Sequence, residues 1–246
     1  MITISLPLIL CMMISAALKR PGLILTIPTQ LPSFNSSIVF KKGNLIRTIA
    51  NAENILGEYI SEEYIPQDFA IYDLSEFISA IGICARDGNY PTLHFENNDY
   101  VTIKGGNLSI RYYFSDPQIT LKVAPEKEVK FPGSNISFTI DQSDLKNLRD
   151  ALAKFNLPEV LFRSRNGKVT VHGVDSENET SNTFWMDFHN GEATDDFDLT
   201  LNTENLRVAR NHDYHVKVSE QLLSEWTVVG PSPDLHLKYF IALEPK

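Results

Sequence analysis

Cysteine, basic charge and catalytic motifs are all scarce in this sequence of 246 residues. Its two cysteines, Cys11 and Cys84, cannot form a disulfide framework, which favours a reducing compartment. Acidic residues outnumber basic ones by 31 to 22, and the formal net charge is −9. A protein that coats nucleic acid with its whole surface would carry the opposite sign. Any contact with DNA must therefore come from a local basic face.

Enzyme signatures are also missing, since the sequence contains no GxSxG motif, phosphate-cradling loop or HExxH motif. Asp195, Asp196 and Asp198 form an acidic cluster that a hydrolase or a calcium site could use. The cluster lacks a glycine-centred ligand loop, which favours a solvated loop before a strand. His212 and His215 lie in a segment of strand character, which puts them on opposite faces. We expect no catalysis, no cofactor and no metal.

The amino-terminal segment, residues 1–32, differs from the rest of the chain. It is apolar to about Leu18, is interrupted by Pro7, and continues with Lys19 and Arg20. Three interpretations are open: a secretory signal or membrane anchor, an apolar element packed on the domain, or non-native residues ahead of a wrongly assigned start. The first would make the protein an exported or membrane-anchored β-rich binding protein, which is the alternative hypothesis.

The body of the chain contains a unit of strand, capped helix, hairpin and strand. In the first copy, residues 69–72 have extended character, and Asp73 with Glu76 predicts a capping box. Two short β-type runs precede it, and Gly43-Asn44 between them predicts a hairpin. The helical stripe, the next hairpin turn and the last strand follow at Phe77, Ile78 and Ile81, at Asn98-Asp99, and at residues 108–114.

The same order recurs 68 residues later. Asp141 is the predicted cap, with Asp144 at the third position. Leu145, Leu148 and Leu152 form the buried stripe, and Asn166-Gly167 is a strong two-residue hairpin signal. Agreement of cap, stripe and turn in one order predicts a duplication of the whole supersecondary unit. Gly105-Gly106, in contrast, is interpreted as a lone turn signal.

The duplication predicts an α+β fold of two similar domains built mostly of antiparallel strands. We place the first domain at residues 33–123, a Pro- and charge-rich connector at 124–132, and the second domain at 133–246. A third helix is expected after residue 202. Asn202 would cap it, and Leu206 and Ala209 would face inward.

Positive charge concentrates on the second and third predicted helices. The second carries Lys146, Arg149 and Lys154 off its leucine stripe, and the third carries Arg207 and Arg210 on one face. A solvated helix face is one interpretation. The other is a surface that follows phosphates without reading bases, for which long cationic side chains are suited. Aromatic residues are not interleaved with these cations, so duplex DNA fits better than a single strand.

Several stretches resemble the DNA polymerase processivity clamps of T-even-type bacteriophages, from about Ser33 to the C-terminus. They are DFAIYDLSEF, the connector VAPEKEVKFP, IDQSDLKNL with NGKVTVHG, and the ending YFIALE. The resemblance implies a homotrimeric ring around duplex DNA, with antiparallel sheets outside and short helices lining the inner face. It implies a sliding clamp without an active site that tethers the viral DNA polymerase. Lys146, Arg149, Lys154, Arg207 and Arg210 would face the channel.

The resemblance also implies partners and a location. A clamp loader opens such rings with ATP, and in T-even phages the clamp also activates late transcription by host RNA polymerase with late-transcription factors. The expected location is the host cell cytoplasm, with no membrane partner. Client proteins dock peptides beside the connector, which nominates Ala124, Pro125, Phe131, Pro132, Ala242 and Leu243.

One departure from this family concerns the first helix of domain one, which bears lysines in the family. Here the Pro-broken apolar stretch ending near Leu31 takes its place. We expect a faulty gene start to explain this difference.

Overall fold

The computed structural model describes residues 35–85, 91–116, 122–178, 180–230 and 236–245. The predicted nature of residues 1–32 therefore lies outside the described residues. The chain divides into two compact units, one of residues 1–51 and 58–124, the other of residues 52–57 and 125–246.

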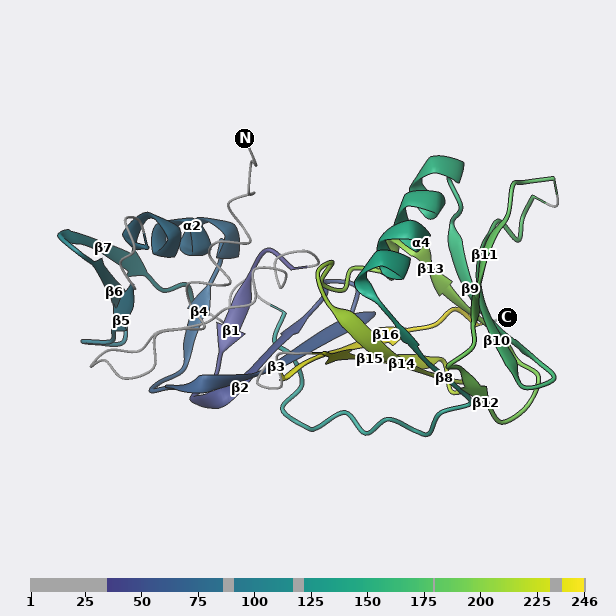
Figure 1. Ribbon diagram of the computed structural model, residues 1–246. Coiled ribbons are helices and arrows are strands. Elements are labelled where there is room, and N and C mark those ends of the chain that lie inside the picture. The colour runs from purple at the N-terminus through teal and green to yellow at the C-terminus, as the bar shows by residue number, and fades with distance from the viewer. Residues whose placement is uncertain (1–34, 86–90, 117–121, 179, 231–235, 246) are drawn as a thin grey trace. The chain divides into compact units, whose positions relative to one another are not determined.

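The described residues of the first unit include helix α2 and antiparallel strands (Figure 1). Strand β1 pairs with β4, and β5, β6 and β7 form a three-stranded sheet in that order. Helix α2 lies against β6 and β7. The elements are β1 (Ile38–Phe40), β2 (Gly43–Ile49), β3 (Ile55–Ile65), β4 (Phe69–Ile71), α2 (Leu74–Cys84), β5 (Thr92–His94), β6 (Tyr100–Gly105) and β7 (Leu108–Tyr113). Strand β3 begins in the second unit and continues into the first.

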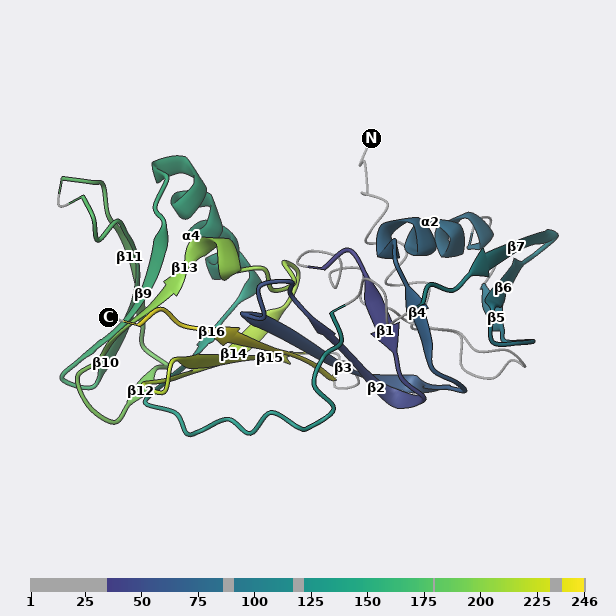
Figure 2. The same ribbon diagram turned by 180° about the vertical axis from the view of Figure 1, so that it is seen from behind.

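In the second unit, the residues that the structure describes include helix α4 and strands of two antiparallel sheets (Figure 2). One sheet has the order β11-β10-β9-β13, and the other includes the consecutive strands β12-β8-β14-β15-β16. The elements are β8 (Ile136–Ile140), α4 (Gln142–Phe155), β9 (Glu159–Arg165), β10 (Lys168–Val174), β11 (Phe184–Phe188), β12 (Glu192–Ala193), β13 (Asp198–Asn202), the 3-10 turn η3 (Thr203–Asn205), β14 (Asp213–Ser219), β15 (Leu223–Val229) and β16 (His236–Ala242).

The predicted repeat is confirmed, because β4, α2 and β5–β7 match β8, α4 and β9–β11 in type and order. Asp73 accepts a hydrogen bond from the Glu76 backbone N–H, and Asp141 accepts one from that of Asp144. The turn at Asn166-Gly167 is confirmed by positive φ at both residues, 51° and 75°. The α+β fold follows from this arrangement.

The helix stripes form part of the core of each unit. Phe77 and Ile81 are buried on α2, and Leu145, Leu148 and Leu152 are buried on α4. In the second unit the core also includes large aromatic side chains from both sheets. Burial of each leucine contributes roughly 2 kcal/mol. The aromatic members are Phe138, Phe162, Phe188, Tyr214, Trp226 and Tyr239.

The predicted hairpin at Gly43-Asn44 is wrong. Strand β1 pairs with β4, with Ile38 opposite Ile71, while β2 belongs to another sheet. The connection is held by Asp68, whose carboxylate accepts hydrogen bonds from the Lys42 backbone N–H and the Lys41 ammonium. These bonds tie residues 41–42 to the segment before β4.

The predicted third helix is also wrong, although its cap is present. Asn202 accepts a hydrogen bond from the Glu204 backbone N–H, but only the 3-10 turn η3 follows. Leu206 and Ala209 are buried as expected, at 6% and 1% exposure. Their spacing was consistent with a helix, yet residues 206–212 have irregular backbone.

Candidate nucleic-acid interface

The exposed side of α4 carries two of the predicted cations. Because the leucine stripe faces the core, Lys146 and Lys154 project from the rest of the helix and are exposed. The Lys146 ammonium lies 2.7 Å from the Asp150 carboxylate, one helical turn further along. This i,i+4 pair partly neutralises the positive charge of the helix surface.

Asp150 lies among three of the predicted cations. Its pKa is lowered by the hydrogen bond from Lys146, and further by the positive charges of Lys146, Lys154 and Arg210. Lys146 and Lys154 lie one helical turn before and one after Asp150 on α4. The structure therefore places two lysines beside Asp150 on the helix, and the charge of Arg210, from a second segment, acts on the same carboxylate.

Arg149 is the exception among the predicted contacts. Its Nη2 donates to the backbone carbonyls of Leu206, at 3.0 Å, and Val208, at 2.7 Å. Burial lowers the pKa of Arg149, and the like charge of Arg210 adds to this effect. The guanidinium is thus engaged with the chain itself.

Arg207 and Arg210 are exposed in the irregular segment that follows η3. The Arg207 Nε donates to the Glu204 carbonyl at 2.7 Å. Both residues flank buried positions, with Val208 and Ala209 at 3% and 1% exposure. The cationic surface is therefore composite: it comprises Lys146, Lys154, Arg207 and Arg210 on one helix and one loop.

This arrangement suits weak contact with phosphates. Lysine and arginine side chains on long stems attract a polyanion without base readout. The Asp150 carboxylate competes for the same cations and limits the strength of attraction. Sequence reasoning found the cations, and the i,i+4 spacing of Lys146 and Asp150 was the available signal for the carboxylate's role.

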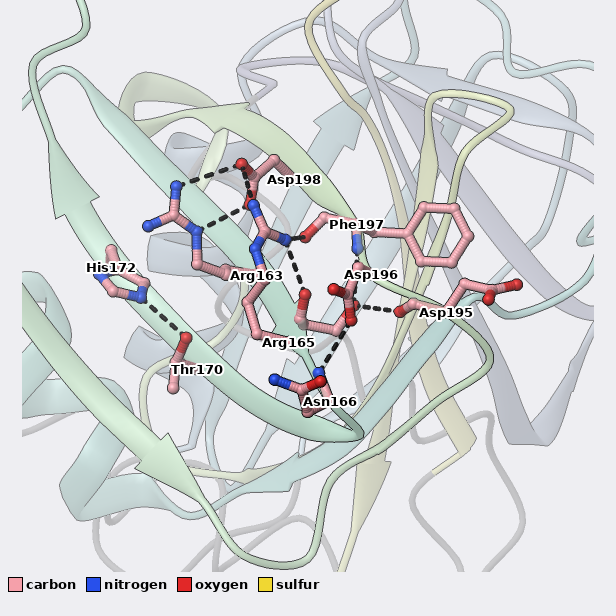
Figure 3. Close-up of polar contacts among 10 residues, drawn as sticks. Arg163, Arg165, Asn166, Thr170, His172, Asp195, Asp196, Phe197 and Asp198 are labelled. Atoms are coloured by element: carbon pink, nitrogen blue, oxygen red, sulfur yellow. Dashed lines mark hydrogen bonds and ion pairs between the residues drawn. The ribbon is translucent and has the colours of Figure 1, made fainter.

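The acidic cluster is used for structural contacts (Figure 3). The Asp198 carboxylate accepts hydrogen bonds from Arg163 at 2.8 and 3.1 Å and from Arg165 at 2.7 Å. Burial alone would raise the pKa of Asp198, but these two guanidinium groups lower it overall. The Asp196 carboxylate accepts the backbone N–H of Asn166 at the hairpin turn. Sequence reasoning missed these arginine partners.

Two other expectations concern metals and membranes. Among the described residues, no group of three or more histidine, cysteine or acidic side chains is arranged to hold a metal ion. His215 lies in β14 between the buried Tyr214 and Val216, so its side chain takes the opposite face of the strand. In the same part of the chain, no helix has the length and apolarity needed to cross a bilayer.

The residues nominated for client peptides fall into two groups. Ala124, Pro125, Phe131 and Pro132 lie in a connector without regular structure, where the two prolines are exposed. Ala242 ends β16, and Leu243 is buried at 5% exposure. The Leu243 backbone N–H donates to the Leu222 carbonyl, which fixes the tail on the sheet. Docking of a peptide at these residues stays a prediction.

Comparison with solved structures identifies the fold class of this chain. No protein-family model matches the sequence. The chain is similar to the PCNA of A. fulgidus, solved with the C-terminal region of FEN-1 bound, at a TM-score of 0.65 and 14% identity, covering 98% of this chain and 96% of that one. It is similar to PCNA from Thermococcus kodakaraensis at a TM-score of 0.65 and 14% identity, covering 87% and 93%. The fold is the clamp fold.

Comparison with curated protein sequences finds relatives among the sliding clamps of bacteriophages. A sliding clamp of Vibrio phage KVP40 is 26% identical over 215 residues, covering 85% of this chain and 91% of the phage protein. The sliding clamp of Escherichia phage RB69 is 24% identical over 180 residues, covering 72% and 76%. That of Enterobacteria phage T4 is 24% identical over 181 residues. The chain is thus a homologue of the sliding clamps of T4-type phages, and the resemblance found in the sequence is confirmed.

Proposed function

We propose that this protein is a sliding clamp that encircles duplex DNA as a homotrimer and tethers the viral DNA polymerase during replication. The observation that carries the proposal is the duplicated strand–helix–hairpin unit, which has the clamp fold and phage clamps as sequence relatives. The protein would act by tethering, without catalysis. Tethering raises the polymerase concentration at the primer end, to about millimolar for a short flexible link.

Ring assembly requires two different surfaces that join head to tail. Strands β7 and β11 suit this role, because each ends the order of its sheet. Tyr113 on β7 and Trp185 on β11 are 63% and 59% exposed. At the other end of the β11-β10-β9-β13 sheet, Thr200 of β13 forms an isolated bridge with Glu244. Pairing β7 of one copy with β11 of the next would bury both edges.

The cationic surface supports the DNA part of the proposal. A closed ring is retained by topology, so its contacts with phosphates need only be weak, and Asp150, which pairs with Lys146 on this surface, fits that requirement. We propose Lys146, Lys154, Arg207 and Arg210 as the phosphate-facing residues. Arg149, the fifth predicted residue, is not among them, because its guanidinium is bonded to backbone carbonyls.

Further partners follow from the clamp role. A closed ring needs a clamp loader that uses ATP to open it, and the connector with Ala242 and Leu243 would receive client peptides. The proposal places this work in the host cell cytoplasm. Host RNA polymerase with late-transcription factors is a further proposed client.

The test has two parts, both on the full chain. Light scattering after size exclusion should give about three times the chain mass of 27.8 kDa. The double variant Lys154→Glu and Arg210→Glu should then shorten the products of the viral polymerase on a primed template. Its trimer should remain intact, because neither residue lies on β7 or β11.

The matched control is Lys168→Glu, at the hairpin between β9 and β10, where an exposed lysine lies in a different element. It makes the same kind of charge change and should leave product length unaltered. A monomer at micromolar concentration, or equal shortening by the control, would contradict the proposal.

A further inference from the structure

Arg149 has the contacts of an internal tie between α4 and the segment after η3. Its Nη2 atom reaches two carbonyls, 57 and 59 residues further along the chain. Hydrogen bonds from a charged donor are stronger than those between neutral groups. A single side chain therefore fixes the position of residues 206–208 against the helix.

The tied segment has little regular structure of its own to hold it. After η3 the backbone is irregular up to β14. Leu206 and Val208 are buried at 6% and 3% exposure. The Tyr214 hydroxyl donates to the Ala209 carbonyl at 2.9 Å, which provides a second tie. Side chains thus satisfy carbonyls that helix amides would satisfy in a regular helix.

The two exposed arginines are placed by these ties. Arg207 lies between Leu206 and Val208, whose carbonyls Arg149 holds, and Arg210 follows Ala209, whose carbonyl Tyr214 holds. Fixing the buried residues sets the direction in which their exposed neighbours leave the backbone. The positions of Arg207 and Arg210 therefore depend on these hydrogen bonds from Arg149 and Tyr214.

A direct phosphate contact by Arg149 is disfavoured by the same geometry. The Arg149 side chain is partly buried, and this burial lowers its pKa. Moving Nη2 to a phosphate would leave the carbonyls of Leu206 and Val208 without this donor. A buried carbonyl left without a donor destabilises the fold.

We propose that Arg149 is a positioning residue: it holds residues 206–208 against α4 so that Arg207 and Arg210 face the DNA, and it makes no phosphate contact itself. This inference rests on the proposed DNA surface. Arg149 thus has a different role from Arg207 and Arg210, although all three carry the same charge.

The first experiment measures how binding of the full chain to a short fluorescent duplex falls with salt. Removing one phosphate-binding side chain should reduce the slope of log K against log salt by about 0.9 per engaged subunit. The double variant Arg207→Ala and Arg210→Ala should therefore reduce it by about 1.8 per engaged subunit, and the control Lys154→Met by about 0.9 per engaged subunit.

Arg149→Met and Arg149→Lys distinguish the two roles. A lysine keeps the charge, but its nitrogen lies one bond short of Nη2, so it should not restore both carbonyl contacts. Because Arg149 holds the carbonyls that flank Arg207, while Tyr214 separately holds that of Ala209, a positioning residue predicts that both variants reduce the slope by about 0.9 per engaged subunit and that further removal of Arg207 then adds little. A direct phosphate role predicts a reduction of about 0.9 for methionine, rescue by lysine and additive effects, and this result would overturn the inference.

A second readout does not involve DNA. Limited trypsin digestion of the folded protein should cleave after Arg207 and Arg210 faster in both Arg149 variants and at the parent rate in Lys154→Met. Unchanged cleavage would overturn the inference, even if a variant were less stable overall. If removal of Arg207 and Arg210 leaves the salt slope of the parent unchanged, the proposed DNA surface itself is wrong. If that removal lowers the slope while the Arg149 variants do not, only the positioning role is wrong.

Discussion

Adding one methyl group at equivalent positions of the two repeats should have unequal effects. Gly105 and Gly173 lie 68 residues apart, the same spacing as the capping residues Asp73 and Asp141. Each glycine lies near the end of a hairpin strand. Gly105 faces the last residue of α2, and Gly173 faces the C-terminal part of α4 and Leu157 just after it. Neither has the positive φ that would itself disfavour alanine. The difference must therefore come from what the new Cβ would contact.

The contacts differ in kind. At Gly105 a Cβ would lie 1.9 Å from the Cys84 carbonyl oxygen, which is backbone at the end of α2. At Gly173 it would lie 2.8 Å from a Leu157 methyl carbon and 2.9 Å from one of Leu152. Leucine methyl groups can move by rotamer adjustment, whereas a helix carbonyl moves only with its helix. Gly173→Ala should cost about 1–3 kcal/mol, as overpacking does, and Gly105→Ala should exceed about 3 kcal/mol.

Chemical denaturation measures this difference in free energy of unfolding. Both tryptophans, Trp185 and Trp226, belong to the second unit, so their fluorescence reports Gly173→Ala. Far-ultraviolet circular dichroism is needed for Gly105→Ala in the first unit. Equal costs for the two variants, or a larger cost at Gly173, would refute the argument from backbone against side-chain contacts.

Two further predictions concern charge. Asp150→Asn should free Lys146 for phosphate and steepen the salt dependence of DNA binding by about 0.9; an unchanged slope in the fluorescent-duplex assay would contradict it. Asp198→Asn should cost about 1–2 kcal/mol in urea denaturation at neutral pH, because Arg163 and Arg165 lose a charged acceptor. The lowered pKa of Asp198 means that its contribution is present above its ordinary pKa of 3.8 and is lost as pH falls through the lowered value. The stability difference between parent and variant should therefore shrink in acid, and a constant difference would be incompatible with the ion pairs.

Much of the fold was predictable from local signals. Asp73 and Asp141 act as caps, and the Asn166-Gly167 turn forms as its residues require, because these signals depend on a few adjacent residues. The repeat spacing then predicted two similar halves. Local signals did not explain Gly105, which is needed because the end of α2 lies too close to leave room for a Cβ. The turn at Gly105-Gly106 depends on Gly106, whose φ is 59°.

The misinterpretations have one physical origin. Leu206 and Ala209 are buried at helical spacing, but the side chains of Arg149, distant in sequence, and of Tyr214 satisfy the backbone there, and an irregular segment results. Strand β1 likewise finds its partner in β4 rather than in its neighbour in sequence. Long-range partners leave no periodic signal in a single sequence.

The candidate site was predictable in part for the same reason. Exposed cations are visible as charges off an apolar stripe, and Lys146 and Lys154 are exposed as that pattern indicates. The role of Arg149 depends on carbonyls more than fifty residues away. Composition and spacing could not distinguish an arginine that bonds the backbone of its own chain from one that would contact a DNA phosphate.

Retention on DNA of different topology tests the clamp proposal most directly. The labelled protein is loaded onto a nicked circular duplex by the proposed clamp loader, and its dissociation is followed before and after one cut linearises the circle. Encirclement predicts slow loss from the circle and rapid loss from the free ends after cutting, at the same salt concentration. Equal rates of loss from circular and linear DNA would contradict it.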